Sequence, residues 1–162
     1  MAYIRKDYYT GIHGDIADDV FANLSWEACR LLDLHTTGID GIKKLKVAFP
    51  TDEDDSETVK RCACKLVNLL HQIQQAESAA NAVHGYESTE QGMRGKVITS
   101  VSAGNESISY STGNAAATVI DKAVTDKTVR DSLISTTIRE YLSGIADANG
   151  VNLLYMGPYP HR

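Results

Sequence analysis

The sequence predicts a mainly α protein: a small helical bundle with three main helices, one β-hairpin and an extended C-terminal tail. Apolar residues recur every three or four positions in three long segments, which is typical of amphipathic helices. One serine-rich segment changes to a period of two, which is typical of strands. The last residues, NLLYMGPYPHR, combine apolar side chains with two prolines. A chain of 162 residues has the size of one domain. It can bury roughly 70% of its unfolded surface without the help of disulfide bonds or metal ions.

The three main helices are expected at residues 16–35, 56–83 and 126–143. Asp15 is the candidate N-cap of the first helix. The second is the longest and contains no glycine, and the acidic run 52–55 lies just ahead of it, where a helix N-terminus favours negative charge. Gly144 is a plausible end signal for the third. We expect a polar loop for HGYESTEQGMRG, residues 84–95, and a short helix is possible in TGNAAATVIDKAV.

A β-hairpin is predicted at about residues 96–111, where VITSVSAGNESISYS alternates on either side of a turn. An isolated two-stranded hairpin is only marginally stable in water, so we expect this one to contact the helices or another chain. Its core-facing and partner-facing roles stay open. The residues expected to meet a neighbouring subunit or a downstream partner are Val101, Gly104, Asn105, Ile108 and Tyr110.

The segment 151–162 is predicted to be an extended docking tail that follows a helical domain spanning residues 1–150. The ADANG sequence before it would act as a flexible joint, and the prolines would lower the ordering entropy that docking costs. The alternative is that its apolar residues pack under the long helix of the same domain. The candidate docking residues are Leu153, Leu154, Tyr155, Met156, Gly157, Pro158 and Tyr159.

Motifs for catalysis, cofactors and metals are missing from the sequence. Cys62 and Cys64 are two positions apart, and on a helix such residues point to nearly opposite sides, so they cannot grip one ion together. The five histidines show no metal-binding spacing, and the acidic run 52–55 lacks the ligand pattern of an EF-hand. We therefore expect a protein that is not an enzyme and holds no cofactor or metal.

Charge and hydropathy exclude two further classes of protein. Sixteen basic against twenty-one acidic residues give a net charge of −5, with no basic cluster for tight nucleic-acid binding. No apolar run approaches the roughly 20 residues that a membrane-spanning helix needs. The first residues lack the apolar centre of a signal peptide, and the odd number of cysteines argues against a secreted disulfide framework. We expect a protein that is made and kept inside a cell.

Three motifs follow one another in a fixed order: MAYIRKDYYTG at the start, VITSVSAGNESISYS in the middle and YLSGIADANGVNLLYMGPYP at the end. In this combination the chain resembles the head-tail connector (adaptor, or head completion) proteins of tailed bacteriophages and prophages of Gram-positive bacteria. The likeness covers essentially the whole chain. It departs from the family pattern at Met156, where the family has arginine, in the longer ADANG spacing, and in the extra residues 159–162.

The resemblance implies a non-enzymatic structural virion protein at the head-tail junction, or neck, made in the bacterial host cytoplasm. Such adaptors assemble on the portal protein as a homo-oligomeric ring, expected to be a dodecamer, and extend the DNA channel toward a stopper or tail-completion protein. The C-terminal segment would bind the portal and the hairpin would lie near the channel or the downstream partner. DNA would pass through without sequence-specific binding. No membrane is involved.

Two alternatives stay open. The chain could be a tail terminator or stopper ring protein, a class that is richer in β-strand. It could also be an intracellular enzyme or regulator whose site forms only between subunits.

Overall fold

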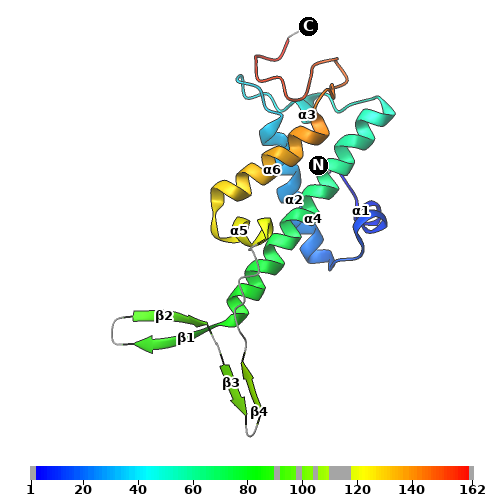
Figure 1. The fold of residues 1–162 in the computed structure, drawn as a ribbon. Coiled ribbons are helices and arrows are strands. Elements are labelled where there is room, and N and C mark those ends of the chain that lie inside the picture. Colours follow the sequence, from blue (N-terminus) through cyan, green and yellow to red (C-terminus); the bar gives the residue numbers. More distant parts are fainter. Residues whose placement is uncertain (1–2, 90–91, 98–99, 104–105, 110–117, 161–162) are drawn as a thin grey trace. The chain divides into compact units, whose positions relative to one another are not determined.

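The computed structural model describes residues 3–89, 92–97, 100–103, 106–109 and 118–160. It is mainly helical, as the sequence predicts, and the three predicted main helices correspond to α2, α4 and α6 (Figure 1). The chain divides into two compact units, Met1–His71 with Asp131–Arg162, and Gln72–Arg130. This division differs from the expected helical domain 1–150 and separate tail, because the C-terminal segment belongs to the first unit.

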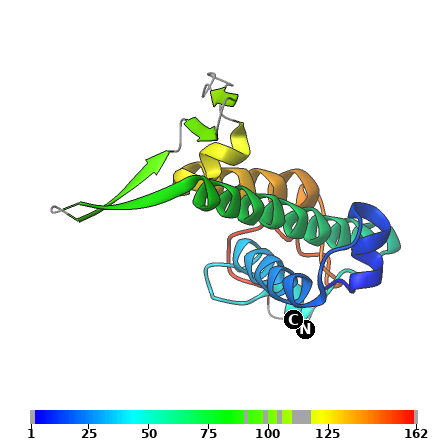
Figure 2. The same cartoon turned by 90° about the horizontal axis from the view of Figure 1, so that it is seen from below.

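The first unit is organised around the part of α4, Glu53–Val83, that ends at His71. Within this unit α2, Asp18–His35, and the part of α6, Lys127–Leu142, that begins at Asp131 both lie alongside α4 (Figures 1 and 2). Cys62, Ala63 and Cys64 are consecutive residues of α4, which a helix distributes around its axis, and all three are fully buried. The first unit therefore packs against α4 from more than one side. Further fully buried core residues are Leu32, Val59, Leu66, Val67, Ile138, Leu142 and Leu153.

The helix termini differ from the prediction in instructive ways. The long helix begins at Glu53, because the Asp52 carboxylate accepts the Asp55 amide at 3.1 Å and so caps the helix earlier than the expected Ser56. The acidic run thus forms the first turn itself. Asp15 does not cap α2, which begins at Asp18; its carboxylate instead lies 3.1 Å from the Lys6 ammonium.

The N-terminal helix α1, Lys6–His13, is not predicted by the sequence. Its stability comes from tertiary contacts. Tyr9 is buried with its ring 5.6 Å from that of Phe21 on α2, and the Tyr8 hydroxyl donates to the Glu57 carboxylate of α4 at 2.5 Å. Eight residues are too few for an isolated helix to be stable in water, so α1 depends on this packing.

The second unit contains the end of α4, two antiparallel strand pairs and α5, Val119–Thr125. The expected loop at 84–95 is wrong: β1, His84–Thr89, pairs with β2, Gly92–Val97, from His84 opposite Val97 to Thr89 opposite Gly92. The strand β3, Ser100–Ala103, pairs with β4, Glu106–Ser109. This second pair lies inside the interval 96–111 predicted as a hairpin, but residues 96 and 97 belong to β2 instead.

The short helix α5 is fixed at both ends. Thr118 and Asp121 form a capping box, in which the Asp121 amide donates to the Thr118 hydroxyl at 3.2 Å and the Asp121 carboxylate accepts the Thr118 amide at 2.8 Å. The Arg130 guanidinium donates to the Ala123 carbonyl at 3.0 Å and to the Glu77 carboxylate at 2.6 Å. Arg130 therefore joins α5 to the last turns of α4 within this unit.

Candidate docking site on the C-terminal segment

The ADANG loop after α6 is held closed by its own aspartate. Asp147 is buried, and its Oδ1 atom accepts the backbone amides of Asn149 and Val151, each at 2.9 Å. Gly150 adopts φ 76°, a left-handed conformation that favours glycine. The Leu153 amide then donates to the Ile145 carbonyl at 2.9 Å, so the chain turns back toward the end of α6. The loop expected to be a flexible joint is thus a closed turn.

Two residues of the segment anchor it in the first unit. Leu153 is fully buried, and Tyr159 is largely buried. The Tyr159 hydroxyl donates to Asp147 Oδ2 at 2.6 Å and accepts from the Asn149 side-chain amide at 2.8 Å, while the Tyr159 backbone amide donates to Asp40 Oδ2 at 2.5 Å. Burial, and more weakly the Asp147 carboxylate, raises the pKa of the Tyr159 phenol, an effect that Asn149 partly offsets. Of the two alternatives left open by the sequence, the structure has the segment folded onto its own unit.

A buried lysine holds the backbone of this segment. Lys44 lies on the four-residue helix α3, Lys44–Val47, and its side chain is fully buried. Its ammonium donates to the carbonyls of Thr36 at 3.2 Å and Leu153 at 3.1 Å, and also to the carbonyl of Tyr155. Burial lowers the pKa of Lys44, whereas the charges of Asp40 and Asp147 act in the opposite direction. Three ammonium hydrogens meet three carbonyls, so the donor capacity of the group is used.

The loop that follows α2 pairs with the segment. The Ile39 amide donates to the Met156 carbonyl at 2.9 Å. At Gly38 an added Cβ would lie only 2.7 Å from the Gly157 carbonyl oxygen, so a side chain there would push the two backbones apart. Glycine is needed at residue 38 because of this close approach.

The result is an exposed apolar surface on a fixed backbone. Ile39 is 82% exposed, Met156 61% and Tyr155 50%, and the bonds described above keep these residues beside one another. We call Ile39, Tyr155 and Met156 the docking surface. The Tyr155 ring centroid lies 6.0 Å from the Lys44 ammonium, which further ties the exposed ring to the buried charge. Such a surface is suited to an apolar recess on another protein.

The candidate docking residues therefore divide by exposure. Leu153 and Tyr159 support the segment from within, whereas Tyr155, Met156 and Pro158 are exposed; Leu154 and Gly157 are half-buried. Sequence reasoning missed Lys44, Asp40 and Asp147, the residues that hold the segment. No sequence signal separates Lys44 from its neighbours, because KKLK has the composition of a solvated surface.

Among the hairpin candidates, Val101 lies opposite Ile108 in the β3–β4 register. Gly104, Asn105 and Tyr110 lie outside the described residues. The hairpin and tail candidates belong to different compact units. Their roles toward a neighbouring subunit or a downstream partner stay predictions.

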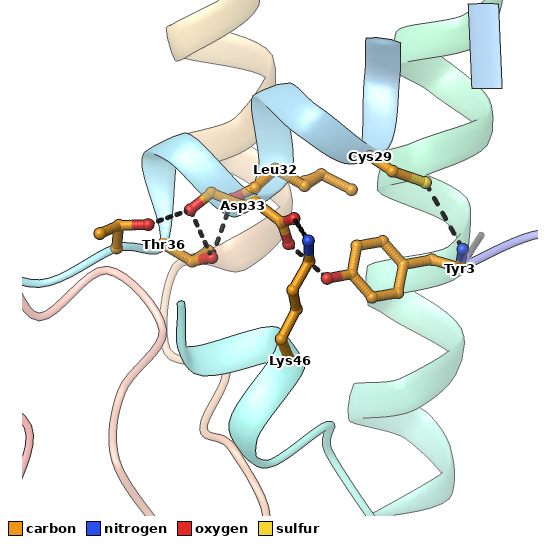
Figure 3. Close-up of polar contacts among 7 residues, drawn as sticks. Tyr3, Cys29, Leu32, Asp33, Thr36 and Lys46 are labelled. Carbon is orange, nitrogen blue, oxygen red and sulfur yellow. Dashed lines mark hydrogen bonds and ion pairs between the residues drawn. The ribbon is translucent and has the colours of Figure 1, made fainter. Parts of the chain in front are cut away.

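A second polar cluster fastens the N-terminal end of the chain to α2 (Figure 3). The Tyr3 hydroxyl donates to the buried Asp33 carboxylate, whose other oxygen lies 3.0 Å from the Lys46 ammonium. The Tyr3 amide donates to the Cys29 sulfur at 3.4 Å, and the Tyr3 ring stacks on Phe49 at 5.6 Å. Burial, followed by the Asp33 hydrogen bond and charge, raises the pKa of Tyr3. The polar groups of this cluster bond to one another, so a structural role accounts for their burial.

The cysteines offer no nucleophile. Burial raises the pKa of Cys62 to about 12 and that of Cys64 to about 11, and it raises the pKa of Cys29 as well. Thiols with raised pKa values stay protonated, and hence unreactive, at neutral pH. In the described part of the chain, no three His, Cys, Asp or Glu side chains are grouped so that they could hold a metal ion. Within that part, too, no helix combines the length and apolarity needed to cross a bilayer.

No protein-family model, curated protein or solved structure matches the chain.

Proposed function

We propose that the protein is a structural adaptor of a tailed phage or prophage, which forms a homo-oligomeric ring at the head-tail junction and binds the portal protein through its docking surface. The resemblance of the ordered sequence motifs to head-tail connector proteins supports this function. In the proposed ring, a dodecamer in the manner of that family, the protein extends the DNA channel toward a stopper or tail-completion protein. DNA passes through without sequence-specific binding.

The observation that carries the proposal is the exposed cluster of Ile39, Tyr155 and Met156 on a backbone fixed by hydrogen bonds. The C-terminal segment is the portal-binding part in the family that the chain resembles. Here the same segment presents apolar side chains on a backbone that is held by hydrogen bonds before binding, so that little backbone entropy is lost on docking. Val101 and Ile108, together with Gly104, Asn105 and Tyr110, are proposed to face a neighbouring subunit or the downstream partner.

The alternatives are less well supported. A tail terminator or stopper ring protein is expected to be rich in strand, whereas the described residues contain six helices and only two short strand pairs. An enzyme with a site between subunits would need reactive groups at exposed positions. The three cysteines are all buried, and burial keeps their thiols protonated.

The proposal is tested by mixing the purified full-length protein with purified portal assemblies from the same phage or prophage and imaging them by electron microscopy. The wild-type protein should add a ring of density to one end of the portal. Met156→Asp should abolish that ring or weaken binding by roughly thirtyfold, because loss of an apolar anchor costs about 2 kcal/mol of binding free energy.

Val119→Asp is the matched control, since Val119 is 57% exposed and lies on α5 in the other unit. It should bind like the wild type. Normal binding by Met156→Asp, or equal loss with both variants, would contradict the assignment of the portal site to the docking surface.

A further inference from the structure

The two stretches of chain that form the docking surface are joined through one buried atom. Ile39 follows the end of α2, whereas Tyr155 and Met156 belong to the C-terminal segment. The Lys44 ammonium donates to the Thr36 carbonyl on the first stretch and to the Leu153 and Tyr155 carbonyls on the second. It therefore bridges the two stretches directly beneath the exposed residues.

Removing this ammonium has local consequences. The described bonds of Lys44 go to backbone carbonyls, so an apolar side chain of similar length would leave these buried acceptors without their donor. Two further hydrogen bonds join the segment to the loop that begins at Thr36. They run from the Ile39 amide to the Met156 carbonyl and from the Tyr159 amide to the Asp40 carboxylate. Release of Lys44 should loosen them as well.

Lys46 provides an internal comparison. It lies two residues further along α3, but its half-exposed ammonium pairs with Asp33. Asp33 belongs to the N-terminal cluster, and the bonds described for Lys46 do not involve the C-terminal segment. Of the two lysines, Lys44 alone donates to the backbone of the docking segment.

We propose that Lys44 is the positioning residue for portal docking: it holds Tyr155 and Met156 beside Ile39, so that the C-terminal segment docks in its folded-back form and is not released from its own domain to bind. This inference rests on the proposed function. Lys44 itself is buried beneath the docking surface and acts through Tyr155 and Met156.

The test follows amide hydrogen exchange at Ile39 and Tyr159, whose amides report the two ties of the segment, alongside the dissociation constant for portal assemblies. Lys44→Met should raise exchange at both amides while exchange in the middle of α6 stays unchanged. If the freed segment occupies the docking geometry about a tenth of the time, portal binding weakens about tenfold. Lys46→Met should alter neither the two amides nor portal binding.

Chemical rescue separates positioning from general destabilisation. Lys44→Ala lacks the atoms that propylammonium would supply, so adding propylammonium should restore both the exchange protection and portal binding. Neutral propanol, which has one hydroxyl donor and no charge, should restore neither. Equal rescue by both compounds would show that filled volume suffices, and would overturn the role assigned to the ammonium.

A measurement on the wild-type protein keeps the inference falsifiable even if the Lys44 variants do not fold. Docking in the folded-back form predicts slower exchange at the Ile39 and Tyr159 amides in the portal complex than in the free protein. Faster exchange at these amides, or unchanged or tighter portal binding by a folded Lys44→Met, would overturn the inference. Loss of binding in Met156→Asp alongside either result would leave the proposed function and its docking surface standing. Failure of the wild-type protein to add a ring to the portal would remove the proposed function itself.

Discussion

The two ends of the chain are both fastened through α3, but by different chemistry. At the N-terminal end, Lys46 and Tyr3 share the Asp33 carboxylate, so a charge meets an opposite charge at a partly exposed site. At the C-terminal end, Lys44 is buried and bonds to backbone carbonyls. A bond between two side chains holds one residue in place. Bonds to backbone carbonyls hold the path of the chain, whatever side chains that part of the chain carries. The second arrangement therefore suits a segment whose exposed side chains serve a partner.

The most severe way to break the C-terminal end is to remove its buried apolar anchor. Leu153 is fully buried, so Leu153→Ala should lower the free energy of unfolding by about 2–5 kcal/mol through lost burial and the cavity left behind. Urea denaturation followed by circular dichroism measures this loss. Leu154→Ala is the control, because Leu154 is half-buried and should cost clearly less. Equal effects at the two positions would show that Leu153 does not anchor the segment.

Truncation of the C-terminal segment would disturb the fold of the first unit as well as docking. Deletion of residues 151–162 removes Leu153 and Tyr159 from the core of the first unit, together with two acceptors of Lys44. A truncated protein that fails to bind the portal could have lost its fold. Substitutions at the exposed Tyr155 and Met156 are the cleaner test of docking.

The contrast between the two ends also shows what sequence patterns can predict. The periods of α2, α4 and α6 are visible because each helix places several apolar residues on one stripe. The helix α1 lacks such a stripe and depends on Tyr8 and Tyr9 meeting α4 and α2. The strands β1 and β2 were missed because their six residue pairs consist mostly of polar residues and glycine and show no alternation.

The candidate site was predictable only in its exposed part. Apolar residues in NLLYMGPYP draw attention to a docking role, and Tyr155 and Met156 are indeed exposed. Composition could not show that the neighbouring Leu153 faces inward, because the segment follows no regular period. Nor could it show that Lys44, over a hundred residues earlier, donates to the carbonyl of Leu153. Contacts between distant loops are set by tertiary packing, which leaves no local pattern.

A smaller and more specific comparison uses the two tyrosines that donate to buried aspartates. Tyr159→Phe removes the hydroxyl that donates to Asp147 Oδ2, while Asp147 Oδ1 still accepts two backbone amides. The substitution should lower the free energy of unfolding by about 1–3 kcal/mol at neutral pH. Tyr3→Phe leaves Asp33 paired with Lys46 and should cost about 0.5–1.5 kcal/mol. Urea denaturation of the two variants at neutral pH measures the difference. A larger loss for Tyr3→Phe would show that Lys46 does not compensate for the missing hydroxyl.

Raising the pH should widen this difference, because the cost of Tyr3→Phe should fall further than that of Tyr159→Phe. Burial and Asp33 both raise the pKa of Tyr3, whereas the rise in the pKa of Tyr159 is partly offset by Asn149. An unfolded chain loses its phenol protons near pH 10. Above that pH the native state holds more protons than the unfolded state, so the free energy of unfolding falls as the pH rises.

Removing a tyrosine with a raised pKa should make that fall less steep, and Tyr3→Phe should do so more than Tyr159→Phe. Chemical denaturation of both variants and the wild type at several values between about pH 9 and 11, the range around the ordinary phenol pKa, measures the three slopes. Because lysine titration is common to all three proteins, differences between the slopes isolate the phenols. A slope for Tyr3→Phe as steep as that of the wild type would mean that the Tyr3 phenol titrates alike in the folded and unfolded chain, and that Asp33 does not hold its proton.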